Sequence, residues 1–386
     1  MQRIFGCVLL LACGAAAAQT PTGRSTLTLI DPTRGNREIP LELYYPATSA
    51  GTDVPFAAGA FPVIAFGHGF AMQPTDYGTL ADGLAAAGYL VASVGSETGF
   101  APSHADFGLD LLFTAATLPQ LATEPGNLLN GHVLPRRAIA GHSMGGGATW
   151  LAAAAAAPAG VALDCIAGLA PAETNPSAIA AASAVGIPSL ILSGDADAVT
   201  PPADHHLPIH DATAADCRAF VSILDGGHCG YADGGSLCDL GELFFSGLDR
   251  PTQTALTLDL LTVWFDHHLK DDPDAWSLFT SYDASTPHTV TTVDCAASVA
   301  PLAATALPAA FPNPFTDVLH LEPCPQPSAA DRAVLFALGG QRVADFAGST
   351  PAITLPIDPT LPAGPYLLQR TCGTAVARHI VLKGVE

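Results

Sequence analysis

Residues 137–147 read RAIAGHSMGGG, an apolar run that leads into a serine flanked by glycines. The run is typical of a buried strand, and the alanine-rich residues that follow are typical of a helix. A strand that turns directly into a helix around G-x-S-x-G indicates a nucleophile elbow, in which a strained turn exposes the serine hydroxyl. Gly141 and Gly145 would remove side chains that collide at such a turn. We therefore predict that Ser143 is a catalytic nucleophile.

Two backbone N–H groups are the predicted oxyanion hole. The first peptide of the helix after the elbow, at Met144, lies at the positive end of the helix dipole, where an oxyanion would be stabilised. A second donor is expected in the loop after the strand over 61–66, which reads Gly67-His68-Gly69-Phe70. We predict that Phe70 supplies it. The alternative is that His68 and Phe70 only pack the loop.

The acid and the base are expected after later strands, in the chain order serine, acid, histidine. Residues 194–201 read GDADAVTP, and the G-x-x-D-x-x-x-P spacing selects Asp197 over Asp195 as the acid. The next strand leads into His228. An imidazole can take the serine proton and return it to a leaving group, while a carboxylate fixes its tautomer. Asp195 is the rival for the acid; with Asp197 chosen, it would be a turn residue that hydrogen-bonds its own backbone. The alternative for His228 is a solvated loop histidine.

Short β-branched or aromatic runs alternate with longer Ala- and Leu-rich segments between residues 25 and 270. This alternation predicts an α/β fold with a mostly parallel, eight-stranded sheet flanked by helices. Too few residues separate the sixth strand from Ile187 for a helical lid, so we expect a site open to bulky or polymeric esters. The predicted strands are 25–30, 39–45, 61–66, 89–94, 137–142, 165–169, 187–193 and 219–224, and the predicted helices centre on 76–87, 106–118, 145–157 and 252–269.

The two ends of the chain differ from this central part. An Arg, an apolar run and small residues predict a secretory signal peptide over 1–18, and a lipoprotein acylated at Cys13 is the alternative. Residues 296–310 lose charge and periodicity, as linkers do. We predict a catalytic domain over 19–295 and a small all-β sandwich over 311–386. No run downstream of residue 20 has the roughly 18 apolar residues of a transmembrane helix.

The charge excludes one class of partner. The formal net charge is −21, and Lys270 and Lys383 are the only lysines. Because phosphate binding needs a basic surface, we expect no nucleic-acid partner. The same charge disfavours docking on anionic membranes.

The cysteines and histidines indicate an exported chain without a cofactor. An odd number of cysteines follows the signal peptide, so at least one stays free or pairs outside the chain. A bridge between Cys229 and Cys238 would pin the loop after His228, and Cys217 is the rival partner. No C-x-x-C zinc spacing occurs, and the acidic and histidine group at 204–211 lies in a Pro-rich loop, so we predict no metal. The seven cysteines are Cys165, Cys217, Cys229, Cys238, Cys295, Cys324 and Cys372.

Residues 25–270 resemble the lidless α/β-hydrolases that include dienelactone hydrolases, chlorophyllases and the cutinase-like polyesterases that attack poly(ethylene terephthalate). Motif order is most similar to the polyesterases. The resemblance implies an α/β-hydrolase fold and a secreted carboxylic ester hydrolase that forms an acyl-enzyme. It assigns a triad and an oxyanion hole to the residues singled out above: Ser143, Asp197 and His228, with Phe70 and Met144.

The chain departs from the polyesterases at two places. Ala172 follows Ala170-Pro171 where an aromatic residue is usual, and the insertion from Gly230 to Thr252 is longer than usual. Both departures bear on whether aromatic polyesters are substrates. A peptidase or thioesterase with the same triad, and a non-catalytic surface adhesin, are the alternative functions.

The C-terminal residues resemble the sorting domains of the type IX secretion system. The matching stretches are FPNPF at 311–315, GQRV at 340–343, LPAGPYLL at 361–368 and VLK at 381–383. The resemblance implies the type IX machinery as a partner and a secreted or cell-surface location. An accessory carbohydrate-binding or adhesive β-sandwich is the alternative. A bridge between Cys324 and Cys372 would depart from the cysteine-poor pattern of these domains.

Overall fold

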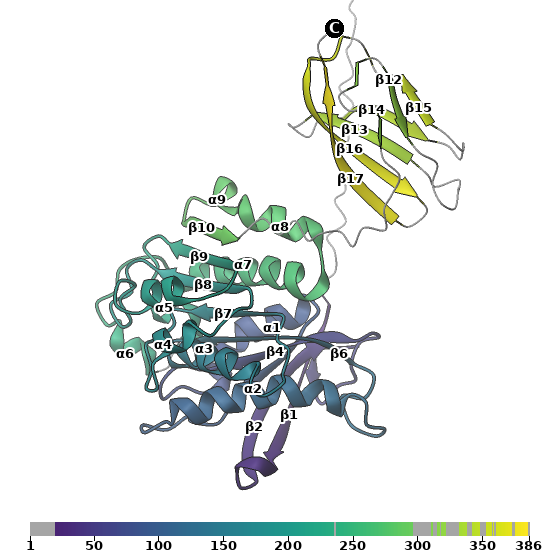
Figure 1. Cartoon of the computed structure of the whole chain (residues 1–386). Coiled ribbons are helices and arrows are strands. Elements are labelled where there is room, and N and C mark those ends of the chain that lie inside the picture. Colours follow the sequence, from purple (N-terminus) through teal and green to yellow (C-terminus); the bar gives the residue numbers. More distant parts are fainter. Residues whose placement is uncertain are drawn as a thin grey trace, which may run out of the picture. The chain divides into compact units, whose positions relative to one another are not determined.

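The described residues before 296 fold around a mixed sheet of ten strands (Figure 1). In sheet order the strands are β10 (Thr289–Cys295), β9 (Cys217–Ile223), β8 (Ser189–Gly194), β7 (Cys165–Leu169), β6 (Val133–His142), β4 (Phe61–Gly67), β5 (Leu90–Val94), β2 (Arg37–Pro46), β1 (Thr22–Asp31) and β3 (Gly51–Thr52). The six strands from β9 to β5 are parallel, whereas β10 pairs antiparallel with β9, and β2 pairs antiparallel with both β5 and β1.

The chain divides into two units between residues 296 and 297. The predicted signal peptide over 1–18 and all but the last residue of the predicted linker over 296–310 lie outside the described residues. The computed structural model describes residues 20–234, 237–295, 310–311, 315–316, 318–321, 332–337, 342–347, 353–356, 358, 360–372 and 375–384.

All eight predicted strands are present, and β3 and β10 are additional. β3 is only two residues long, which is too short for a sequence pattern to reveal. β10 follows the last predicted helix, beyond the alternation of strands and helices that ends near residue 270. The disulfide between Cys217 and Cys295 joins directly opposite residues of β9 and β10, so the rival pairing of Cys217 with the loop after His228 is excluded.

Four long helices lie where the sequence predicts them, and shorter helices fill the loops between strands. The segment 204–211, expected to be a Pro-rich loop, instead contains the start of a helix. Pro208 is tolerated there because the first turn of a helix has no internal acceptors for its N–H groups. The helices are α1 (Gly78–Ala86), α2 (His104–Leu121), α3 (Met144–Ala156), α4 (Ala178–Ala182), α5 (His206–Ala212), α6 (Cys238–Gly241), α7 (Arg250–Lys270), α8 (Pro273–Thr280) and α9 (Tyr282–Ser285), with 3-10 turns η1 (Pro32–Arg34), η2 (Pro74–Tyr77) and η3 (Cys229–Tyr231).

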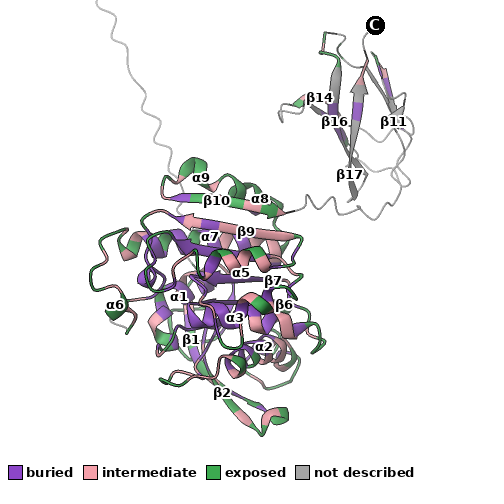
Figure 2. Cartoon of the chain, turned by 60° about the vertical axis from the view of Figure 1, so that its left-hand side comes forward, coloured by how far each residue is buried: buried purple, intermediate pink, exposed green. Residues whose placement is uncertain are grey.

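Helices cover both faces of the sheet, and the central strands are buried between them (Figure 2). Neighbouring residues of β4 alternate between two cores, because successive side chains of a strand point to opposite faces. Val63 and Ala65 pack with residues of α2 and α3, whereas Ile64 and Phe66 pack with residues of α1 and α7. Burial on both faces explains why these strands read as continuous apolar runs.

The described residues after 309 form two antiparallel sheets. One sheet has the order β11-β12-β15 and the other β14-β13-β16-β17. Phe315, Leu335 and Leu368 belong to their shared core, in agreement with the predicted all-β unit. Cys324 and the side chain of Cys372 lie outside the described residues. The strands are β11 (Ala310–Phe311), β12 (Val318–Leu321), β13 (Arg332–Ala337), β14 (Arg342–Ala347), β15 (Ile353–Pro356), β16 (Gly364–Cys372) and β17 (Ala375–Lys383).

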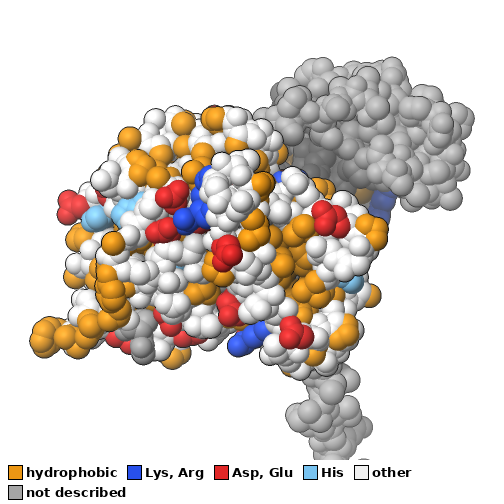
Figure 3. Space-filling model, turned by 90° about the horizontal axis from the view of Figure 1, so that it is seen from below, with side chains coloured by type: hydrophobic (Ala, Val, Ile, Leu, Met, Phe, Trp, Pro, Cys, Tyr) orange, Lys and Arg blue, Asp and Glu red, His pale blue; other side chains and the backbone are white. Residues whose placement is uncertain are grey.

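The surface reflects the acidic composition. On the face seen in Figure 3, acidic side chains are scattered with few basic ones between them. Of the helices within the described ranges, none is long and apolar enough to cross a membrane.

Candidate active site

A strained turn holds Ser143 between β6 and α3. Its φ of 54° and ψ of −116° lie outside the regions that non-glycine residues normally adopt. The turn requires glycine on both sides: a Cβ on Gly141 would lie 2.4 Å from the Gly145 oxygen, and one on Gly145 would lie 2.3 Å from the Gly67 oxygen. The backbone geometry is therefore that of the predicted elbow.

A cavity of about 290 Å³ brings the predicted serine and histidine together. Ser143 lies at the end of β6 and His228 in the loop after β9, so the parallel strands deliver both residues to the same edge of the sheet. Phe70 contributes from the loop after β4. Met144 is buried behind the elbow and does not line the cavity. The lining residues are Phe70, Met72, Phe100, Ser143, Val199, His228, Leu237, Cys238 and Gly241.

Asp197, rather than Asp195, contacts the histidine. The Asp197 Oδ2 lies 2.7 Å from the His228 Nδ1, whereas Asp195 is exposed. The N–H groups of Val199 and Thr200 both donate to the Asp197 Oδ1 at 2.8 Å. Burial alone would raise the pKa of Asp197, but the hydrogen bonds from His228 and Thr200 lower it below its usual value. The carboxylate is thus ionised and aligned with the imidazole.

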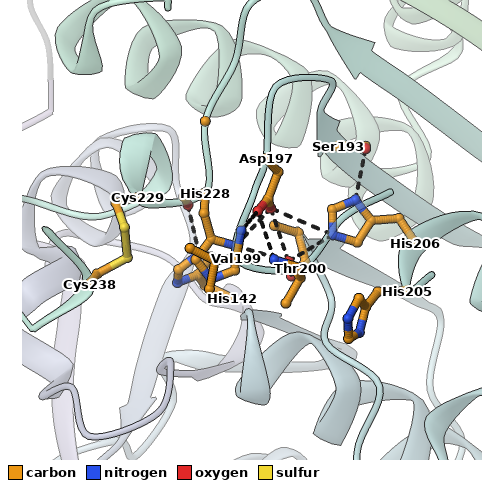
Figure 4. Close-up of polar contacts among 12 residues, drawn as sticks. His142, Ser193, Asp197, Val199, Thr200, His205, His206, His228, Cys229 and Cys238 are labelled. Atoms are coloured by element: carbon orange, nitrogen blue, oxygen red, sulfur yellow. Dashed lines mark hydrogen bonds and ion pairs between the residues drawn. A yellow bond between two sulfur atoms is a disulfide. The ribbon is translucent and has the colours of Figure 1, made fainter. Parts of the chain in front are cut away.

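Thr200 and His206 form a further contact group that sequence reasoning missed (Figure 4). The Thr200 Oγ1 lies 2.9 Å from the Asp197 Oδ2, 2.9 Å from the His228 Nδ1 and 3.0 Å from the His206 Nε2. The His206 Nδ1 lies 2.8 Å from the Ser193 Oγ. Burial lowers the pKa of His206 to about 3, so its ring is neutral. The D-x-x-T spacing could have indicated Thr200; no local signal indicates His206.

Glu242 of the insertion and Gln253 of α7 hold the loop that carries His228. The N–H groups of His228 and Cys229 both donate to the carboxylate of Glu242. The Gln253 amide pairs with both backbone groups of Gly227, at 2.9 and 2.8 Å. A disulfide joins Cys229 to Cys238, which confirms the predicted bridge. Glu242 and Gln253 were missed because neither lies in a recognisable pattern.

Two exposed phenylalanines form the mouth of the cavity. Phe70 is 49% exposed and Phe100 is 76% exposed, and their rings meet edge to face with centroids 6.2 Å apart. Ala172, the departure from the polyesterase pattern, donates its N–H to the backbone carbonyl oxygen of Ser143 at 2.9 Å. The aromatic surface beside Ser143 therefore comes from Phe70 and Phe100 rather than from position 172.

The histidines of segment 204–211 have separate partners. The His205 Nδ1 accepts the Glu173 N–H at 2.9 Å, His206 faces Ser193 and Thr200, and the His210 Nδ1 lies 3.4 Å from the Asp211 Oδ1. Across the part of the chain that the structure describes, no three His, Cys, Asp or Glu side chains are placed to hold a metal ion.

A central parallel sheet, an elbow after β6, and an acid and a histidine in the loops after β8 and β9 define an α/β-hydrolase. A family model described as PETase, PET hydrolase-like, matches residues 40–252, which is more than half of the chain. The chain belongs to this PET hydrolase-like family, which makes it an ester hydrolase of the α/β-hydrolase class. No curated protein matches it.

Proposed function

We propose that the protein is an extracellular carboxylic ester hydrolase that acts through a Ser143–His228–Asp197 triad. The observation that supports it most directly is the 2.7 Å contact between Asp197 and His228 at a cavity that His228 shares with the strained Ser143. Because Nδ1 of His228 faces the carboxylate, Nε2 is the nitrogen left to serve the serine.

The proposed reaction has two halves. His228 takes the Ser143 proton as the hydroxyl attacks the ester carbonyl, and the same proton then leaves with the alcohol, which gives an acyl-enzyme. Water then attacks the acyl group as His228 takes its proton. That proton passes to the Ser143 oxygen as the carboxylic acid product leaves. The N–H groups of Met144 and Phe70 would hold the oxyanion in both halves. In support, neither N–H donates to a carbonyl oxygen in the turn, loop and cap hydrogen bonds of the described residues.

The surroundings of the cavity favour hydrophobic esters, including polymeric ones. Phe70, Phe100 and Val199 present apolar surface around the serine. The insertion adds further exposed apolar side chains, of which Phe244 is 96% exposed. Between β7 and β8 the chain forms only the five-residue α4, so no helical lid covers the site from that connection.

Hydrolysis of p-nitrophenyl acetate, butyrate and palmitate by the whole chain, beside Ser143→Ala, tests the proposal. We expect turnover of the short esters and its loss in the variant. A folded wild type that cleaves matched amides or thioesters but none of these esters would indicate a peptidase or thioesterase that uses the same triad. Absence of turnover on all three substrate types would refute the catalytic proposal.

Export is the second part of the proposal. Two disulfides fit an oxidising compartment, and the described C-terminal residues form an all-β unit. We propose that the signal peptide over 1–18 directs export and that residues 311–386 are recognised by the type IX machinery, as the motif resemblance implies.

A further inference from the structure

A continuous chain of hydrogen bonds runs behind the cavity and joins three of the four segments that carry the proposed active site, which are the loop after β4, the end of β6 and the loop after β9. The Gly69 N–H donates to the Tyr77 hydroxyl at 2.9 Å. The same hydroxyl lies 2.7 Å from the His142 Nδ1. The His142 Nε2 lies 2.9 Å from the backbone oxygen of His228. Tyr77 and His142 are both buried.

The direction of this chain is fixed by its two ends. A backbone N–H can only donate and a carbonyl oxygen can only accept. His142 must therefore carry its proton on Nε2, which leaves Nδ1 as an acceptor. The Tyr77 hydroxyl also lies 3.1 Å from the Met72 sulfur, a weaker acceptor, so it donates chiefly to the closer His142 Nδ1 while it accepts from Gly69. Burial lowers the pKa of His142 well below its usual value and raises the pKa of Tyr77, so both groups are neutral, as this arrangement requires. Bonds aligned in one direction strengthen one another.

The Gly69 residue is held on both sides. Its N–H is bound by Tyr77, and its carbonyl oxygen lies 2.8 Å from the His68 Nδ1 and accepts the Met72 N–H at 3.2 Å. A Cβ on Gly69 would lie 2.7 Å from the Met72 sulfur, so a side chain at this position would have to displace the Met72 side chain. The peptide that begins at the Gly69 carbonyl ends in the Phe70 N–H, the proposed oxyanion donor. Any rotation of Gly69 would re-aim that N–H.

We propose that Tyr77 is a positioning residue for ester hydrolysis: its hydroxyl aligns the Phe70 N–H through Gly69 and the backbone of His228 through His142. The inference rests on the proposed function and goes beyond the triad and oxyanion residues. Donors aimed at a developing oxyanion act mainly in the transition state. Loss of the Tyr77 hydroxyl should therefore lower kcat more than it raises KM.

The test compares Tyr77→Phe with Tyr89→Phe in the whole chain. Tyr77→Phe keeps the ring that packs on Phe66 and removes only the hydroxyl. Tyr89 is a matched control, since it is also buried and donates its hydroxyl to Asp266 at 2.6 Å, away from the cavity. With p-nitrophenyl butyrate we expect kcat of Tyr77→Phe to fall roughly 10- to 100-fold with KM within about threefold, and Tyr89→Phe to stay within about twofold of wild type.

A trifluoromethyl ketone separates positioning from a structural role. Such a ketone forms a tetrahedral adduct with the serine and places an oxyanion in the hole. Its affinity for Tyr77→Phe should fall by about the same factor as kcat/KM, because both depend on the aligned N–H groups. If the variant does not fold, His142→Gln interrupts the same chain at its next member, and it should lower kcat and ketone affinity together.

Three results would overturn the positioning role. These are an unchanged kcat in a folded Tyr77→Phe, an equal loss in Tyr89→Phe, and a loss of kcat without any loss of ketone affinity. In each of these the wild type still hydrolyses esters and Ser143→Ala does not, so the proposed function survives. A wild type without esterase activity would refute the proposed function and this role with it.

Discussion

Asp195 and Asp197 lie two residues apart in one loop, yet their surroundings differ completely. Asp197 is buried against His228 and Thr200, whereas Asp195 faces solvent. Asp197→Asn should keep the shape of the site but present the wrong partner to the imidazole, so we expect kcat to fall roughly 10³- to 10⁴-fold. Asp195→Asn, measured under the same conditions with p-nitrophenyl butyrate, should stay near wild type. A larger loss in Asp195→Asn would reverse the assignment of the acid.

Much of the candidate site follows from local patterns in the sequence. In an α/β fold the loops after successive parallel strands meet at one edge, so the order of Ser143, Asp197 and His228 predicts their meeting. The structure places Asp197 against His228, and Ser143, His228 and Phe70 around one cavity. Their catalytic roles remain predictions.

Other residues of the site could not be found from the sequence. Tyr77 reaches His142 across 65 residues, and Phe100 meets Phe70 from a separate loop. His206 contacts Ser193 and Thr200 only because α5 turns its first residue inward. Such contacts depend on how elements pack in three dimensions, which no spacing records.

At the scale of elements, strands buried on both faces were the most predictable part of the fold. β4, β5, β7 and β8 are short and almost wholly buried, and the second half of β6 is buried too, so their apolar runs place them from the pattern alone. β10 is different: its residues alternate between buried or half-buried and exposed, and it forms the edge of the sheet beyond the last predicted helix. An edge strand buries so little apolar surface that its sequence shows no clear strand pattern.

The two disulfides join different elements. Removing one should mainly lower activity, and removing the other should mainly lower stability. Cys229–Cys238 joins residues that are 9 apart in the sequence, beside His228. Cys217–Cys295 joins residues that are 78 apart, on β9 and β10. Ring-closure entropy predicts losses in the free energy of unfolding of about 2–3 kcal/mol for the first and about 4–5 kcal/mol for the second. The first bridge begins at the residue next to His228, whereas the second lies on the paired strands β9 and β10.

We therefore expect the Cys229→Ser/Cys238→Ser variant to be the more stable of the two variants and the less active. Its kcat should fall roughly fivefold or more, because small displacements of a base are costly. The Cys217→Ser/Cys295→Ser variant should keep kcat within about twofold. Urea unfolding and esterase assays at a temperature where both are folded measure the two quantities. Losses of kcat that simply follow stability would show that the bridge beside His228 has no positioning role.

At the scale of the whole molecule, the candidate active site and the proposed sorting domain belong to different units of the chain. Every residue of the candidate site lies between 68 and 253, in a unit with its own two hydrophobic cores. The C-terminal core, which contains Phe315, Leu335 and Leu368, is distinct from both. A chain that ends at residue 295 should therefore keep its β10 edge, its thermal stability and its kcat on p-nitrophenyl butyrate.

Export should respond in the opposite way. In a bacterium with a type IX secretion system, the full chain should reach the cell surface or the medium, whereas the chain ending at residue 295 should stay in the periplasm, where the signal peptide alone delivers it. Esterase activity assayed in medium, surface and periplasmic fractions measures the distribution, and N-terminal sequencing of the released protein checks cleavage after Ala18. The substitution Phe315→Ser, in the C-terminal core, offers a full-length comparison, because an unfolded sorting unit should retain the protein as truncation does. Equal secretion of the full and truncated chains would assign residues 311–386 to another task, such as carbohydrate binding or adhesion, while leaving the esterase proposal intact.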